Sequence, residues 1–279
     1  MRCAYPPYIF SEIKFTLMVI TMPGSIFISP HHDDVCFSLA ATAIAGHGGQ
    51  LINVFTQSDY ASAPIPCPEE SHERTSYITA LRAREDQTFA DACNLTRHDL
   101  KLEEPSLLGI HPFDLTGVGA ESERLGSILI DHVIRLRQAR TRNKPALFCP
   151  MGIGGHRNHV SVLVAVVHAL PGLRKLFDIH FYEDLHYASR VEYRNAGLLR
   201  FMNLLKGERL SRNVLALTPE LFAQKMSFVG MYFSQHAGTP RASDFIPAAT
   251  GDPGPHEAVW TLSPLTSGTL MAGRKPAWY

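Results

Sequence analysis

The alternation of short apolar runs with longer segments of helical periodicity is the feature that most restricts the fold of this chain. The apolar runs predict strands at residues 25–29, 51–56, 99–102, 145–149 and 178–182. Hydrophobic residues at helical spacing predict helices at residues 34–45, 77–93, 121–140 and 160–170. Strands that alternate with helices are typical of a mainly parallel sheet covered by helices on both faces. We therefore predict a three-layer α/β sandwich.

Other parts of the chain lack this alternation. Residues 59–75 contain three prolines and many polar groups, which predicts a loop. In the last third only residues 219–232 have a helical pattern. The final forty residues, rich in Gly, Pro and Thr, predict an irregular cover on the same domain. A chain of 279 residues can form one large domain, so we predict an N-terminal extension at residues 1–21 and a single domain at residues 22–279.

Composition excludes some classes of function. Lys plus Arg and Asp plus Glu both number 26, so the chain lacks the basic excess of a nucleic-acid-binding protein. The apolar run at residues 15–20 is too short to span a bilayer, and we expect no membrane span. The five cysteines are widely spaced and form no Cys-X-X-Cys pair, which favours a reducing, cytoplasmic location over a disulfide framework. A homo-oligomer is compatible with these features.

Two clusters of ionisable residues follow two of the predicted strands. The first, SPHHDD at residues 29–34, begins at the end of strand 25–29. The second, GIGGHRNH at residues 152–159, comes shortly after strand 145–149. Ligands of α/β folds bind beyond the carboxyl ends of the parallel strands, so we expect both clusters at one site.

Three residues of these clusters have the chemistry of a catalytic zinc site. A catalytic zinc ion prefers three nitrogen or oxygen ligands from the protein and a fourth position for water. His31, Asp34 and His159 supply such a set, so we predict one Zn²⁺ per chain. His32 stands beside them and is an alternative ligand. In such a site zinc polarises an amide carbonyl and lowers the pKa of a bound water to about 7.

The clusters resemble two motifs of a known enzyme family. SPHHDDV at residues 29–35 resembles the HPDDE-type motif of the PIG-L/LmbE family of zinc-dependent N-acetyl-sugar deacetylases, with most similarity to the branch that reads SPHLDDAV. GIGGHRNHV at residues 152–160 resembles the family's glycine-rich loop that ends in HxDH. Weaker matches extend the resemblance over about residues 25–262: RxxE at 82–85, YEDLPY at 182–187, K…YxSQ at 225–235 and ExxW at 257–260.

The resemblance implies a Rossmann-like fold and a role for each site residue. His31, Asp34 and His159 would bind zinc, and Asp33 would be the general base that activates water. His156 would be the general acid or would polarise the developing oxyanion. The amine leaving group would take its proton from Asp33 or His156. The substrate would be a small N-acetylated sugar or a glycoconjugate, hydrolysed to acetate and a free amine.

Three further residues are candidates for substrate contacts: Arg82, Asn158 and His186. The family pattern places Arg82 near the sugar. An ion pair on the helix surface with Glu85 or Asp86 is the alternative. His186 replaces a family proline beside the expected pocket, where it is either a substrate contact or an exposed loop residue.

Asn158 is the main departure from the family pattern, because it replaces the usual Asp between the two histidines. A carboxylate at this position would orient His156 and raise its pKa, whereas an amide orients without charge. We therefore expect either that His156 is harder to protonate than in relatives, or that Glu183 or Asp184 supplies the missing charge.

Two other functions share these sequence features. Clusters of His and Asp also form the two-metal sites of phosphodiesterases, but few additional carboxylates stand near the two motifs. A non-catalytic sugar-binding protein of the same fold would not need Asp33, the expected base. Release of acetate from an N-acetylated sugar, together with the zinc content, separates a deacetylase from both alternatives.

Overall fold

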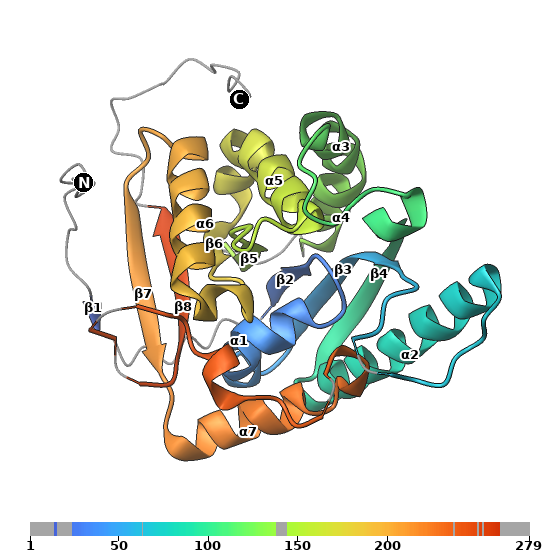
Figure 1. The fold of residues 1–279 in the computed structure, drawn as a ribbon. Coiled ribbons are helices and arrows are strands. Elements are labelled where there is room, and N and C mark those ends of the chain that lie inside the picture. The colour runs from blue at the N-terminus through green and yellow to red at the C-terminus, as the bar shows by residue number, and fades with distance from the viewer. Residues whose placement is uncertain are drawn as a thin grey trace, which may run out of the picture.

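The computed structural model describes residues 14–15, 24–62, 64–137, 144–236, 238–249, 251–252 and 254–262. Within these ranges eight strands form one sheet in the order β1-β7-β8-β6-β5-β2-β3-β4 (Figure 1). The strands are β1 (Lys14–Phe15), β2 (Ser25–Ser29), β3 (Gly49–Gln57), β4 (Leu95–Glu103), β5 (Ala146–Pro150), β6 (Asp178–Tyr182), β7 (Leu210–Ala216) and β8 (His256–Leu262). Only β8 runs antiparallel to its neighbours, β6 and β7.

Helices cover both faces of the sheet. They are α1 (Asp34–Ala45), α2 (Ser71–Ala92), α3 (Val118–Leu125), α4 (Asp131–Leu136), α5 (Arg157–Leu176), α6 (Val191–Leu204) and α7 (Pro219–Val229). Figure 1 shows α1, α2 and α7 on one face and α3 to α6 on the other. The chain builds from β2 to β4 in one direction and from β5 to β6 in the other, and right-handed crossovers then place the connecting helices on opposite faces. The predicted three-layer sandwich is confirmed.

The predicted elements of the first half have the right type, with some shifted ends. β2, α1 and β6 coincide with their predicted ranges. Helix α2 begins at Ser71, inside the predicted loop 59–75. It starts there because the carboxylate of Glu70 accepts a hydrogen bond from the backbone N–H of Glu73 (2.8 Å) and caps the helix.

The helix predicted at residues 121–140 is divided. A wider π-helical turn at Gly126–Ile130 separates α3 from α4, and such turns interrupt an otherwise regular helix. Residues 138–140, the end of the predicted range, lie outside the described residues.

The last third contains more regular structure than its pattern predicts. Strand β8 lies in the region expected to be an irregular cover, and α6 and β7 have no counterpart among the predicted elements. β8 takes its strand conformation from pairing with β6 and β7 on either side, since strand formation depends strongly on neighbouring strands. β1 pairs with β7 at the sheet edge, within the predicted extension 1–21. The rest of that extension lies outside the described residues, so the domain boundary stays a prediction.

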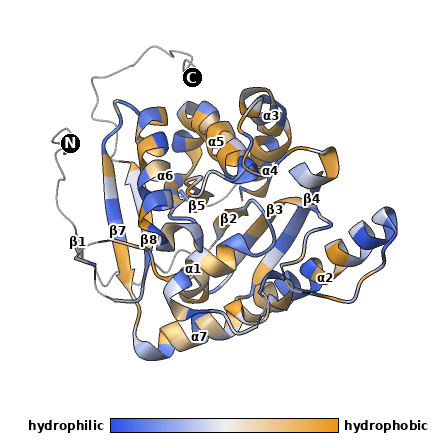
Figure 2. Ribbon diagram, in the orientation of Figure 1, coloured by the Kyte–Doolittle hydropathy of each residue, from blue (hydrophilic) through white to orange (hydrophobic). Residues whose placement is uncertain are grey.

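The core lies on both sides of the central strands. Phe27 of β2 and Phe148 of β5 stack with ring centroids 4.8 Å apart. Figure 2 shows hydrophobic residues on α1 and α5, one helix from each outer layer. In the part of the chain that the structure describes, α5 alone has the length and composition to cross a membrane, but it packs on β5 as a core helix and more than half of it is buried.

A buried ion pair fixes α1, the helix that begins at the first ionisable cluster. This helix is irregular at Leu39 (φ −134°, ψ 23°). Just beyond the break, the carboxylate of Glu257 accepts hydrogen bonds from the backbone N–H groups of Ala41 and Thr42, both at 2.9 Å. Lys225 Nζ lies 3.0 Å from Glu257 Oε1, and both side chains are buried. The K…YxSQ and ExxW segments therefore meet behind α1 and hold it in place.

We expect Glu257→Ala to lower the free energy of unfolding by about 3–5 kcal/mol, because it leaves Lys225 buried without a counter-charge. The matched control is Glu208→Ala. Its partner Arg174 is partly exposed, and such a pair contributes about 0–1 kcal/mol. Urea unfolding followed by circular dichroism measures both variants. Equal losses would contradict the anchoring role of Glu257.

Candidate metal centre

The two ionisable clusters meet where β2 and β5 pair at the centre of the sheet. From these two strands the chain builds outward in opposite directions, which makes this point the topological switch of the sheet. Ligands of α/β sheets bind beyond the strand ends at such a point. Residues 30–34 follow β2 and residues 151–156 follow β5, so the structure brings both clusters to this position.

Asp34 lies between His31 and His159, with one carboxylate oxygen near each ring. Oδ2 of Asp34 lies 3.2 Å from His31 Nδ1, and Oδ1 of Asp34 lies 3.3 Å from His159 Nε2. Two ligands at about 2.0–2.1 Å from a tetrahedral zinc ion lie about 3.3 Å from each other. The donor types therefore suit zinc, and each oxygen of Asp34 has this spacing to one of the two rings. All three side chains are buried, and their role as ligands stays a prediction.

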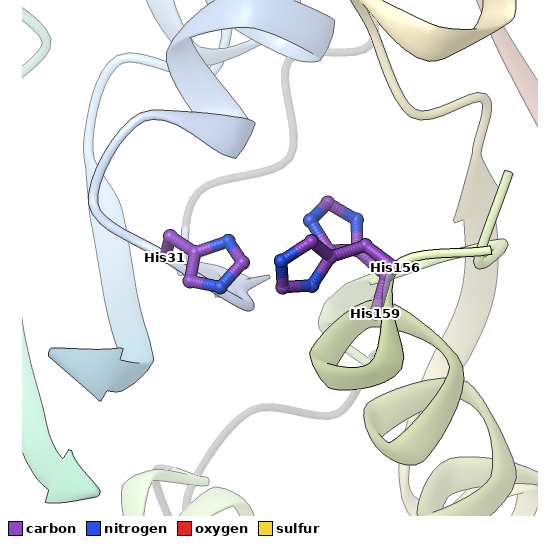
Figure 3. Close-up of side chains that lie close together, drawn as sticks. All are labelled: His31, His156 and His159. Carbon is purple, nitrogen blue, oxygen red and sulfur yellow. The ribbon is translucent and has the colours of Figure 1, made fainter. Parts of the chain in front are cut away.

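A third histidine ring belongs to the same cluster. Figure 3 shows His31, His156 and His159 with their rings gathered where the two loops meet. The ring centroids of His31 and His156 are 4.8 Å apart, edge to face, and those of His156 and His159 are 5.5 Å apart. The ligand atoms of these three residues lie within 4.8 Å of one another, as do those of His31, Asp33 and Asp34. Neither combination is the predicted set of His31, Asp34 and His159, so the cluster offers other combinations of metal ligands as well.

Asp184 holds His159 in one orientation. His159 Nδ1 lies 2.7 Å from Asp184 Oδ1, while Asp184 Oδ2 accepts hydrogen bonds from the backbone N–H groups of Met151 and Ile153. This leaves His159 Nε2 facing Asp34, the arrangement by which a carboxylate orients a metal-binding histidine. Burial disfavours the charged ring, but the carboxylates of Asp34 and Asp184 outweigh it and raise the pKa of His159 to about 9. A metal ion bound at Nε2 would displace this proton.

His156 is a neutral ring at the start of α5. Its Nδ1 accepts a hydrogen bond from the backbone N–H of Asn158 (3.3 Å). Burial, together with the nearby rings of His31 and His159, lowers the pKa of His156 to about 2. With Nδ1 accepting, the single proton of the neutral ring is on Nε2. The ring can therefore donate a hydrogen bond from Nε2, but it holds no second proton near neutral pH.

The side chain of Asn158 does not orient His156, which corrects the expectation from the family pattern. It lies on the first turn of α5 with Nδ2 2.9 Å from His31 Nε2. The carboxylate of Glu183 is paired with two arginines, and the carboxylate of Asp184 is paired with the ring of His159. Neither supplies charge to His156, and its low pKa agrees with a ring that is hard to protonate.

Asp33 and Arg82 form an ion pair beside the metal centre. Arg82 Nη2 lies 3.3 Å from Asp33 Oδ1. Arg82 Nη1 also donates to Glu104 Oε1 (2.6 Å) and to Ser58 Oγ (2.9 Å). The alternative of an ion pair on the helix surface is wrong, because Arg82 is buried. Its contacts fix the carboxylate of Asp33, and its role in substrate binding stays a prediction.

His32 lies in a separate buried group. Its Nε2 is 3.4 Å from Asp99 Oδ2, and Asn53 Nδ2 donates to both Asp86 and Asp99. His32, Asp86 and Asp99 have the spacing of a second metal group, but Arg97 lies 3.3 Å from Asp99 and supplies positive charge there. The structure therefore does not bring His32 to the metal centre.

A cavity of about 670 Å³ opens at the metal centre. His186 lines this cavity with an exposed side chain, so both sequence interpretations of it remain. Gly154 (φ +91°) packs under the wall residue Tyr187, whose ring would collide with any side chain at position 154. Sequence reasoning missed Phe113 and His236 in the wall, because single rings in loops give no periodic signal.

No protein-family model matches the chain, and no curated protein matches its sequence. Its structure is similar to a deacetylase of the teicoplanin biosynthesis pathway, with 19% identity, coverage of 85% of this chain and 97% of that chain, and a TM-score of 0.61. The A40926 pseudoaglycone deacetylase matches at 19% identity, 87% and 97% coverage, and a TM-score of 0.55. The zinc-inhibited form of a teicoplanin deacetylase matches at 19% identity, with coverage of 85% of this chain and 97% of that chain and a TM-score of 0.57. At these identities the likeness establishes that the chain has the fold of these deacetylases.

We expect zinc binding at pH 7.5 to release about one proton, because His159 has a pKa of about 9 and gives up its Nε2 proton to the metal. Below pH 9 the zinc affinity should fall about tenfold per pH unit. Calorimetric titration of metal-depleted protein in two buffers of different ionisation enthalpy measures the proton count.

The variant His159→Gln should bind zinc weakly, and the control His111→Ala, an exposed loop residue, should behave as the original protein. Equal heats in the two buffers at pH 7.5 would contradict the assignment of His159 as the protonated ligand.

Proposed function

We propose that this chain is a metal-dependent hydrolase that removes an N-acetyl or related N-acyl group from a substrate containing an amino sugar. The observation that carries the proposal is that Asp33 and His156 line the same cavity as His31, Asp34 and His159. A base, a neutral hydrogen-bond donor and a metal-binding set thus face one space. The fold shared with solved deacetylases supports this reaction class.

We propose His31, Asp34 and His159 as the ligands of one zinc ion per chain. Two imidazoles and one carboxylate suit catalytic zinc, and the distances of 3.2 and 3.3 Å from the two oxygens of Asp34 to His31 Nδ1 and His159 Nε2 support the assignment. Bound there, zinc would supply Lewis acidity toward an amide carbonyl and would make water more acidic.

Asp33 is the general base in this proposal. It precedes the first residue of α1, and its carboxylate lines the cavity next to the metal-binding set. The guanidinium of Arg82, 3.3 Å away, holds that carboxylate in position. Asp33 takes a proton from the attacking water and delivers it to the amine nitrogen when the C–N bond breaks, so that a carboxylic acid and a free amine leave.

His156 stabilises the negative charge that develops on the carbonyl oxygen. The backbone N–H of Asn158 holds Nδ1, which directs the ring and leaves the Nε2 proton available for donation. A donor fixed before the reaction is the arrangement that stabilises an oxyanion most effectively. Because the pKa of His156 is about 2, we prefer this role to that of general acid.

The two alternative functions have less support. A two-metal phosphodiesterase would need a second open metal group. In the described residues the second candidate, His32 with Asp86 and Asp99, is already bonded to Asn53 and Arg97. A non-catalytic sugar-binding protein would give Asp33 and its supporting arginine no purpose.

The variant Asp33→Asn should lower kcat/KM for acetate release from N-acetylglucosamine glycosides by about 10²–10⁴-fold, because the amide cannot accept the proton of water. Its zinc content should stay that of the original protein. Asp131→Asn, on the exposed face of α4, is the control and should retain full rate. Unchanged activity of Asp33→Asn would refute the assigned base, and loss of zinc would make Asp33 a ligand instead.

Removal of the His156 ring should lower kcat by about 10²–10³-fold in His156→Ala, the cost of one oxyanion donor. His156→Asn should recover part of the rate, since its amide N–H donates without titrating. The basic limb of the pH–rate profile should stay in place in His156→Asn, because the original ring is already neutral above about pH 2. Disappearance of that limb would identify His156 as the general acid.

A further inference from the structure

One residue of the first ionisable cluster does not line the cavity. Its neighbours His31 and Asp33 do, but the ring of His32 is 2% exposed and lies elsewhere. His32 Nε2 is 3.4 Å from Oδ2 of Asp99, a residue of β4. Burial of an imidazole costs free energy unless the ring has a polar partner. The contact therefore joins the segment between β2 and α1, residues 30–33, to the sheet. We call this segment the β2 loop.

The carboxylate of Asp99 is itself held by several neighbours. Asn53 lies opposite Asp99 in the pairing of β3 with β4, and its Nδ2 donates to Asp99 Oδ1 (3.1 Å) and to Asp86 Oδ2 of α2 (2.6 Å). Arg97 Nη2 lies 3.3 Å from Asp99 Oδ2. The hydroxyl of Tyr232 donates to the other oxygen of Asp86 (3.0 Å). Buried polar groups that are bonded on several sides favour a single arrangement of the segments they join.

Backbone hydrogen bonds hold the two ends of the β2 loop. The N–H of Phe55 on β3 donates to the carbonyl oxygen of Pro30 (2.8 Å), and the N–H of Phe37 on α1 donates to that of Asp33 (2.9 Å). Between these two points the side chain of His32 contacts β4. This central attachment lies in the chain between a proposed zinc ligand and the proposed base.

We propose that His32 and Asp99 are positioning residues of the metal centre: their contact fixes the β2 loop so that His31 and Asp33, on either side of His32, keep their places in the cavity wall. The inference rests on the proposed function and adds two residues that support it. Consecutive Cα atoms are about 3.8 Å apart across a rigid peptide unit, so a shift of residue 32 moves both neighbours. A misplacement of about 1 Å can cost about 100-fold in rate.

Asp99→Ala tests the contact, because Asp99 is the more exposed partner (20%) and does not line the cavity. The quantities to measure are kcat and KM for acetate release from a methyl glycoside of N-acetylglucosamine, on the zinc-loaded full chain. We expect kcat to fall about 10–100-fold, with little change in KM, since the cavity wall keeps its residues. Asp99→Asn should recover most of this loss, because the amide offers a donor and an acceptor and can bond to either tautomer of the His32 ring.

The matched control is Glu208→Ala, which also removes a partly exposed carboxylate from an arginine, here Arg174 at the end of α5. It should keep the original kcat. Equal kcat in Asp99→Ala and Glu208→Ala would overturn the proposal, as would a rise in KM without loss of kcat. Equal losses in Asp99→Asn and Asp99→Ala would also overturn it, because they would assign the effect to charge instead of to the contact with the ring.

His32→Phe removes the same contact from the other side, and it serves if Asp99→Ala does not fold. Phenylalanine keeps a ring in the buried space but cannot bond to Asp99. It should lose as much kcat as Asp99→Ala, and the two changes together should cost little more than either alone, because both remove one contact. Full activity of His32→Phe, or losses that add, would overturn the proposal.

Zinc affinity tests the positioning apart from the reaction. Competition between metal-depleted protein and a chelator gives the Kd for Zn²⁺. Displacement of His31 should weaken binding about 10–100-fold in Asp99→Ala and His32→Phe, but not in Asp99→Asn or Glu208→Ala. If even the original protein releases no acetate, the proposed function fails, while this pattern of affinities still supports the positioning role. Equal zinc affinities in all variants overturn it.

Discussion

The site depends on the buried carboxylate of Asp184, which joins three parts of the fold. Asp184 follows β6, its Oδ2 accepts the N–H groups of Met151 and Ile153 in the loop after β5, and its Oδ1 holds His159 on α5. A buried carboxylate is costly unless its oxygens are hydrogen-bonded. Here three bonds offset that cost and fix the β5 loop and α5 relative to each other. The ring of His159 then has one orientation, with Nε2 toward Asp34.

The other side of the site is held by the same means. Glu257, paired with Lys225, caps the second part of α1 after its irregular turn. Arg82 joins α2 to Asp33 at the start of α1. The carboxylates of Asp184 and Glu257 are thus bonded to other parts of the protein, whereas Asp33 and His156 line the cavity. This division is expected of an active site, in which supporting residues are fixed so that the reacting groups have a single geometry.

Much of the fold could be predicted from local patterns, and the failures have physical causes. β2, α1 and β6 were predicted with their observed bounds, because each is a short, mostly apolar segment and the glycines after residue 45 end α1. β8 was wrongly predicted to be irregular. Its strand conformation depends on pairing with the two strands that flank it, and the local sequence does not show that pairing. Within the site, the motifs and the strand order predicted the two clusters and their common location. They did not predict that the side chain of Asn158 contacts His31.

By itself the sequence determined the layered α/β order of the elements predicted between residues 25 and 182 and placed two histidine clusters at strand ends, since apolar runs and their order can be recognised from the local sequence. Only the tertiary structure decided which atoms meet across the switch point. Asn158 faces His31, 127 positions away, and Arg82 reaches Asp33 across 49. Such contacts depend on how the strands pair and on which rotamers the packing allows, and no local pattern encodes either.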